Sequence, residues 1–122
     1  MGLQYNLVNQ TKKERIEFGG HISAGKASEL VTYPPAAAIV TWYLLQNPGD
    51  LISFVDDHGE SWPFPEGTWK DHLHYRDVTE ETLSALIDAG HLVEDGREQY
   101  FDDPTAFSRI LRVGGWRWVP ED

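Results

Sequence analysis

The sequence of 122 residues contains no cysteine. A chain without cysteine forms no disulfide, no thiolate metal site and no iron–sulfur cluster, and it has no cysteine nucleophile. A domain of this length can bury a core without such cross-links, because folding removes roughly two-thirds of the surface that the unfolded chain exposes. We therefore expect one domain over residues 1–122, and the absence of cysteine suits the reducing environment of the cytoplasm.

Long apolar runs are also scarce. The longest apolar block, residues 33–45, is shorter than the roughly 18 to 20 residues that a membrane span requires. The first residues lack the basic and apolar regions of a secretion signal. These observations predict a soluble cytoplasmic protein that does not contact a membrane.

Basic residues are few. Ten lysines and arginines stand against twenty acidic residues, and the formal net charge is −10. Residues 50–103 carry fifteen of the acids and three of the bases. Such a segment repels phosphate backbones and attracts a basic surface. The charge pattern therefore argues against nucleic acid and favours a basic protein as the partner.

The apolar block predicts the central helix of the fold. Pro34 and Pro35 suit a helix start, while Asn47, Pro48 and Gly49 are residue types that end helices. A helix over about 35–47 would be apolar on nearly every face, and such helices are buried. Residues 51–55 then predict a short inner strand.

Other periodic segments surround this helix. Alternating apolar residues predict a strand hairpin over 3–7 and 15–18. Thr79 as a cap, two acids in the first turn and Gly90 after the end predict an amphipathic helix over about 80–89. Weaker signals predict a helix over 24–31 capped by Ser23, a hairpin over 92–101 turning at Asp95-Gly96, a helical turn from Asp103-Pro104 and a strand over 116–119. This mixed order indicates an α+β fold with a mixed or mostly antiparallel sheet.

Residues 20–26, from Gly20 to Lys26, read Gly-His-Ile-Ser-Ala-Gly-Lys. The segment resembles the phosphate-binding loop of P-loop nucleotidases, in which backbone amides and the lysine hold phosphate. That resemblance implies a phosphate ligand at this loop. Ala27 departs from the motif, because it lacks the hydroxyl that would bind magnesium.

Three histidines offer a second ligand hypothesis. His72 and His74 would share one face of a strand and could bind a metal with His58, but in a helix they would point apart. The sequence shows no established metal motif and no orderable catalytic triad. We therefore expect no cofactor and lean against an enzyme.

The helix at 79–89 and the Asp95-Gly96 hairpin are similar to the helix and wing of winged-helix regulators. In those proteins the surface of this unit is basic, whereas Glu80, Glu81 and Glu94 make it acidic here. The similarity therefore extends to topology and does not imply DNA binding.

Aromatic residues lie within the acidic half of the chain, between residues 62 and 101. Aromatic anchors supply binding energy and acids supply steering toward a basic partner. Trp62 and Phe64, held by Pro63 and Pro65, are the pair that we expect to be exposed. The proposed partner-binding residues are Asp56, Asp57, Glu60, Trp62, Phe64, Trp69, Glu94, Asp95 and Glu98.

The leading hypothesis is therefore an interaction protein that binds a basic protein, as an inhibitor or immunity-type protein does. The alternative is a metal- or phosphate-binding domain, enzymatic or not, that uses the histidines or residues 20–26. A third hypothesis is a structural subunit completed by self-association. The sequence does not decide the oligomeric state or the partner's identity.

Overall fold

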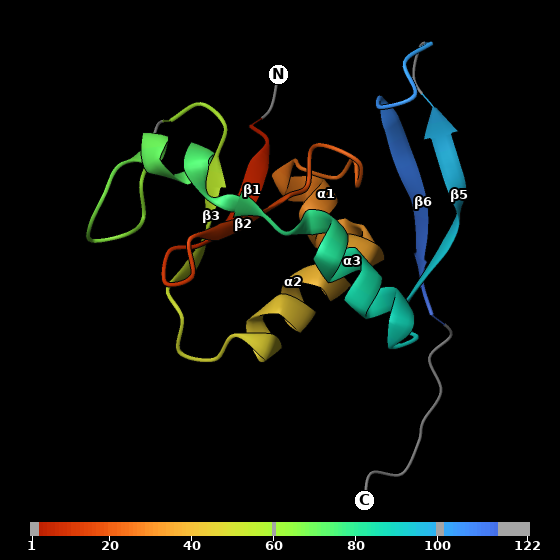
Figure 1. Cartoon of the computed structure of the whole chain (residues 1–122), viewed down its shortest axis with the longest axis horizontal. Helices are drawn as coiled ribbons and strands as arrows, with labels where there is room; N and C mark the ends of the chain where they lie inside the picture. Colours follow the sequence, from red (N-terminus) through yellow and green to blue (C-terminus); the bar gives the residue numbers. More distant parts are fainter. Residues whose placement is uncertain (1–2, 60, 100–101, 115–122) are drawn as a thin grey trace, which may run out of the picture.

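The computed structural model describes residues 3–59, 61–99 and 102–114 (Figure 1). Strands and helices are interspersed, which confirms the α+β class. Their order is β1 (Tyr5–Asn9), β2 (Glu14–Glu17), α1 (Ala27–Thr32), α2 (Pro34–Gln46), β3 (Ile52–Asp56), the 3₁₀ helix η1 (Trp69–His74), β4 (Arg76–Asp77), α3 (Thr79–Asp88), β5 (Leu92–Gln99) and β6 (Phe107–Val113).

The larger sheet has the strand order β3-β1-β2-β4. Strand β1 is antiparallel to both β2 and β3, whereas β2 and the short β4 are parallel, so the sheet is mixed as expected. Strand β3 lies at the edge, and the prediction of an inner strand was wrong. Its last residues are nevertheless buried, because the chain that follows folds back over the sheet.

Strand β1 is buried on both faces, although its alternating sequence predicted a half-buried strand. Neighbouring side chains in a strand point to opposite faces. Leu7 packs into the main core with α2 and α3, while Val8 packs into a second cluster with Phe64 and Tyr75. The sheet is therefore a middle layer with hydrophobic cover on each side.

Helix α2 begins and ends within one residue of the predicted limits. It contributes Ala36, Ile39 and Tyr43 to the core. Its outer side is not covered, and Leu45 is 70% exposed. The expectation of burial on nearly every face was therefore wrong for the outer side, because α1, α3 and β6 contact the helix and leave that side uncovered.

Helix α3 is confirmed, but Thr79 is its first residue, the cap position is Val78, and Asp77 just before it holds the first turn. The carboxylate of Asp77 accepts hydrogen bonds from the Thr79 amide at 2.9 Å and from the Thr79 hydroxyl at 2.5 Å. Gly90 follows the helix with φ of +81°, a conformation that favours glycine. Helix α1 starts at Ala27 rather than 24, because the chain at Ser23 still has a positive φ of 56°.

The C-terminal part forms a separate two-stranded sheet, β5-β6. Asp95-Gly96 is a bulge inside β5 and not a turn, since the register shifts between Glu94 and Arg97. The segment after Asp103-Pro104 is β6 and not helical, because its apolar residues pair along β5. The predicted strand at 116–119 lies outside the described residues.

Candidate functional site

The long connection between β3 and β4 packs on the outer face of the larger sheet. We call residues 57–59 and 61–75, which include η1, the acid–aromatic loop. Its rings Phe64 and Tyr75, together with the partly buried Trp62 and Trp69, cover Val8 and Val55. In Figure 1 the loop occupies one end of the molecule.

Two indole hydrogen bonds hold this loop in one conformation. Trp69 Nε1 donates to the Asp56 carbonyl at 2.6 Å, and Trp62 Nε1 donates to the Glu66 carbonyl at 2.7 Å. The side chain of Gln10 donates to the same Glu66 carbonyl at 2.7 Å, which ties the loop to the end of β1. The main-chain path of the loop is therefore fixed before any partner arrives.

Local sequence explains how the loop turns. The Asp71 carboxylate accepts a hydrogen bond from the Thr68 amide at 2.8 Å and so caps η1. Gly59 has φ of +74°, and its missing side chain leaves room for the ring of Trp69, which would lie 3.3 Å from a Cβ atom. At the far end, Arg15 on β2 donates to the carbonyls of Tyr75 and His72.

Two of the predicted contact residues are buried supports. Asp56 is 4% exposed, and its carboxylate accepts hydrogen bonds from the His58 amide and the Ser61 hydroxyl. Phe64 is buried against the ring of Trp62, with centroids 4.9 Å apart. The expected exposed pair of Trp62 and Phe64 is therefore wrong for Phe64, and Asp56 lies below the surface that a partner would meet.

The other carboxylates of this loop face solvent. Asp57, Glu66 and Asp71 are exposed, and none of them forms an ion pair with a lysine or arginine in the part of the chain that the structure describes. Asp57 Oδ1 lies 3.6 Å from His58 Nε2. The predicted Glu60 lies outside the described residues. Among the described residues these three carboxylates therefore form no ion pair with a lysine or arginine, although Lys13 lines a hollow with Glu66 and Asp71 and Lys70 lies in the same loop.

The predicted acids of β5 lie elsewhere and are mostly neutralised. Figure 1 shows the β5–β6 hairpin and the acid–aromatic loop at opposite ends of the molecule. Glu94 pairs with Arg109, and Asp95 pairs with Arg112 at 2.7 Å. Glu98 is exposed and forms no ion pair among the described residues. The nine predicted residues therefore do not form one surface.

Arg109 joins the hairpin to the rest of the fold. Its guanidinium donates to Glu94 on β5 and, at 3.0 Å, to Glu80 on α3, while its amide donates to the His21 carbonyl. Burial alone would lower the pKa of Arg109, but the two carboxylates outweigh that effect and the net pKa is raised. Arg109 therefore stays charged and is held by its carboxylates.

The three histidines do not assemble a metal site. His72 is almost completely buried beside Trp69, where its Nδ1 lies 2.5 Å from the Trp69 carbonyl. His58 and His74 are exposed. No group of three or more histidines and carboxylates placed to hold a metal occurs within residues 3–59, 61–99 and 102–114.

Residues 20–26 use their backbone amides internally. The Ser23 amide donates to the Gly20 carbonyl, the Ala24 amide donates to the Phe18 carbonyl, and the Lys26 amide donates to Glu29 Oε1. A phosphate loop needs such amides free to hold the ligand. Helix α1 after the loop is also only six residues long. The segment as folded therefore offers little of the chemistry that its sequence resembles.

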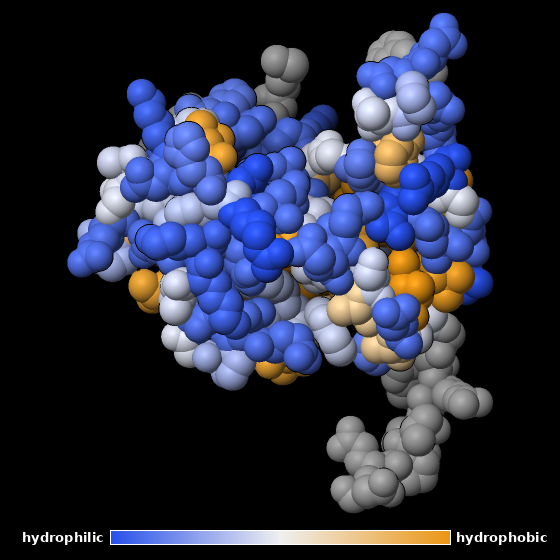
Figure 2. Space-filling view, viewed as in Figure 1, coloured by the Kyte–Doolittle hydropathy of each residue, from blue (hydrophilic) through white to orange (hydrophobic). Residues whose placement is uncertain are grey.

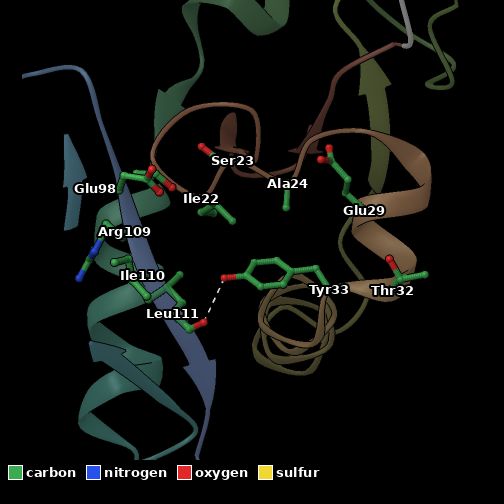
Figure 3. A pocket seen from close by; sticks show the side chains of 11 residues that line it. Ile22, Ser23, Ala24, Glu29, Thr32, Tyr33, Glu98, Arg109, Ile110 and Leu111 are labelled. Carbon is green, nitrogen blue, oxygen red and sulfur yellow. Dashed lines mark hydrogen bonds between the residues drawn. The ribbon is translucent and has the colours of Figure 1, made fainter. Parts of the chain in front are cut away.

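The sequence did not point to a cleft between α1 and β6 (Figure 3). Its volume is about 480 Å³, and it lies between segments almost eighty residues apart in the sequence. No local motif connects these segments, so only the tertiary structure brings them together. The residues that line it are Ile22, Ser23, Ala24, Glu29, Thr32, Tyr33, Glu98, Ser108, Arg109, Ile110 and Leu111.

Comparison of the chain with known protein families, with characterised proteins and with solved structures returned no match. Among the described helices, none has the length and apolar character needed to cross a bilayer.

Proposed function

We propose that this protein is a protein–protein interaction module that binds a basic protein through the acid–aromatic loop. The observation that carries the proposal is the set of three exposed carboxylates, Asp57, Glu66 and Asp71, that have no lysine or arginine partner among the described residues. A cytoplasmic inhibitor or immunity-type protein that masks a basic toxin belongs to this class.

The stiffness of the loop supports the same proposal. The indole hydrogen bonds of Trp62 and Trp69 fix the main chain on which the carboxylates stand. A surface ordered in advance loses less conformational entropy on binding. The partly exposed Trp62 then provides an apolar anchor among charges that steer the partner. Asp56 and Phe64 act as the supports of this surface.

The test compares two single charge reversals. Glu66→Lys changes the loop, and Glu66 contributes only its carbonyl to the described hydrogen bonds. Asp88→Lys is the matched control, because Asp88 is exposed at the end of α3 and the net charge changes equally. Tagged wild type and both variants capture proteins from the native lysate at about 0.05 M and about 0.5 M salt, where the screening lengths are about 14 Å and 4 Å.

We expect one basic protein that wild type and Asp88→Lys retain at low salt and Glu66→Lys does not. With that protein purified, Glu66→Lys should slow association roughly threefold to tenfold at low salt, with a smaller effect on dissociation. Equal losses for both variants would show a general effect of net charge and would refute the assignment of the surface. The absence of any captured basic protein would refute the function.

A further inference from the structure

The cleft between α1 and β6 has an apolar floor with a fixed aromatic wall. Ile22 and Ala24 are buried at its base. The ring of Tyr33 extends across the cleft, and its hydroxyl donates to the Leu111 carbonyl at 3.1 Å (Figure 3). Burial raises the pKa of Tyr33 above the ordinary value of a tyrosine. The cleft is therefore formed without a ligand, and its volume is within the range of small-molecule sites.

The charge of this cleft is negative on both sides. Glu29 comes from α1, and Glu98 comes from β5 and points toward Ile22 (Figure 3). One carboxylate oxygen of Glu29 accepts a hydrogen bond from the Lys26 amide, and the second oxygen takes part in no described hydrogen bond. Arg109 is the one cation among the residues that line the cleft, and its guanidinium turns away to Glu94 and Glu80.

These features together select a class of ligand. Two carboxylates without a cation facing them repel carboxylates and phosphates, and they favour a positive group. The apolar floor favours methylene groups, and the face of a tyrosine ring attracts an ammonium. A compact ammonium on an apolar stem suits the carboxylates, the apolar lining and the tyrosine ring of the cleft. A free amine and the side chain of a lysine share this chemistry.

We propose that the cleft binds an alkylammonium group, with the ammonium at Glu98, the methylene chain along the ring of Tyr33 and the exposed Ile110, and Glu29 adding negative charge from the opposite side of the cleft. This site is separate from the acid–aromatic loop, and it adds a small-ligand function to a protein that the loop would connect to a protein partner. Hydrophobic side chains also gather near the β5–β6 hairpin in the space-filling view, on a face that is otherwise mostly hydrophilic (Figure 2).

The experiment is a titration of the labelled protein followed by backbone amide chemical shifts in low salt. The probes are pentylamine, pentane-1,5-diamine, Nα-acetyl-lysine methylamide and, as the uncharged control, 1-pentanol. We expect saturable shifts at Ser23, Ser108 and Ile110, with Kd values of about 1 mM for the amines, as suits ligands of so few atoms. Tighter binding of the free amines or of the lysine derivative identifies the source of the group.

Variants that replace a carboxylate with an amide of the same shape show which carboxylates contribute to ammonium binding. Glu98→Gln should weaken amine binding roughly fivefold or more, and Glu29→Gln, which removes the charge on the opposite side of the cleft, should weaken it less. In Glu29→Gln the carbonyl oxygen of the new side chain can still accept the Lys26 amide, so the start of α1 keeps its cap. Asp88→Asn removes an exposed charge outside the cleft and should leave the Kd unchanged. Glu66→Lys should also leave it unchanged, which separates this test from that of the loop.

Three results would overturn the proposal. Shifts by 1-pentanol with the same Kd as pentylamine would mean that the cleft is only apolar. Equal weakening by Asp88→Asn and Glu98→Gln would mean a general counterion effect. No saturable shift with any amine up to about 20 mM would mean that the cleft does not bind this class.

Discussion

Replacing Arg109 with methionine should destabilise the protein by about 2 to 3 kcal/mol. The methionine keeps an apolar side chain in the buried position and removes the charge that joins β5 to α3. The Arg109 side chain is 8% exposed, that of Glu94 is 25% exposed and that of Glu80 is 52% exposed. After Arg109 is removed, water can therefore hydrate the carboxylate of Glu80 more easily than that of Glu94.

The magnitude follows from these exposed fractions. Breaking a fully buried pair costs about 3 to 5 kcal/mol, because a charge is left without a partner in a poorly hydrated place. Glu94 is partly hydrated, so its cost is lower. Glu80 is half exposed, and such a pair contributes at most about 1 kcal/mol. Most of the loss should therefore come from the unpaired carboxylate of Glu94.

The assay is urea unfolding followed by tryptophan fluorescence, with the slope of the free energy against urea checked for each variant. Glu80→Gln is the control and should cost less than about 1 kcal/mol. In the Arg109→Met background, Glu94→Gln should restore about 1 kcal/mol, because it removes the unpaired charge. Amide exchange in β5 and β6 should accelerate in Arg109→Met if the hairpin opens before the rest of the fold.

Two results would refute this reasoning. A cost below about 0.5 kcal/mol for Arg109→Met would show that the ion pairs contribute no more than pairs on the surface. No recovery with Glu94→Gln would show that the loss comes from packing alone.

Two further predictions concern capping carboxylates. Asp77→Ala should cost about 1 kcal/mol in the same urea assay, because the Thr79 amide and hydroxyl lose their acceptor at the start of α3, and an equal cost for Asp88→Ala at the other end would contradict the capping role. An NMR titration should find the pKa of Asp103 lowered from the ordinary value of an aspartate, since the Thr105 amide and hydroxyl donate to its carboxylate. A lowered folded-state pKa adds stability above the unfolded value that is lost as the pH falls through the folded value, so the turn should loosen in acid. Thr105→Ala should raise this pKa only in part, because the amide of residue 105, which is the larger cause, remains, and an unchanged value would refute the contribution of the hydroxyl.

The local predictions that succeeded depended on strong chemical signals. Pro34 and Pro35 start α2 because the fixed φ of proline suits the first turn of a helix, and Gly90 follows α3 because glycine adopts a positive φ without steric cost. The prediction of a turn at Asp95-Gly96 was wrong, since the same dipeptide also suits a bulge, and the pairing of β5 with β6 decides between the two.

In the candidate sites, too, local sequence predicted some features and contacts between distant segments decided others. Asp56 was predicted as a contact residue because it belongs to the acidic segment, but it ends β3 and is buried, and its carboxylate accepts a hydrogen bond from the His58 amide. An acidic residue at the end of a strand carries no local signal that would separate a support from a contact. The negative charge of the loop itself was predictable, since it needs only composition.

From the sequence alone follow the α+β class, the positions of α2 and α3, the acidic character and the absence of disulfides. These properties depend on composition and on interactions between residues close along the chain. Tertiary structure alone decided that β3 is an edge strand, that Glu94 and Asp95 are neutralised by β6, and that Glu29 and Glu98 face one cleft. The physical reason is that ion pairs and clefts join segments far apart in the sequence, and no local preference encodes which distant segment will lie alongside.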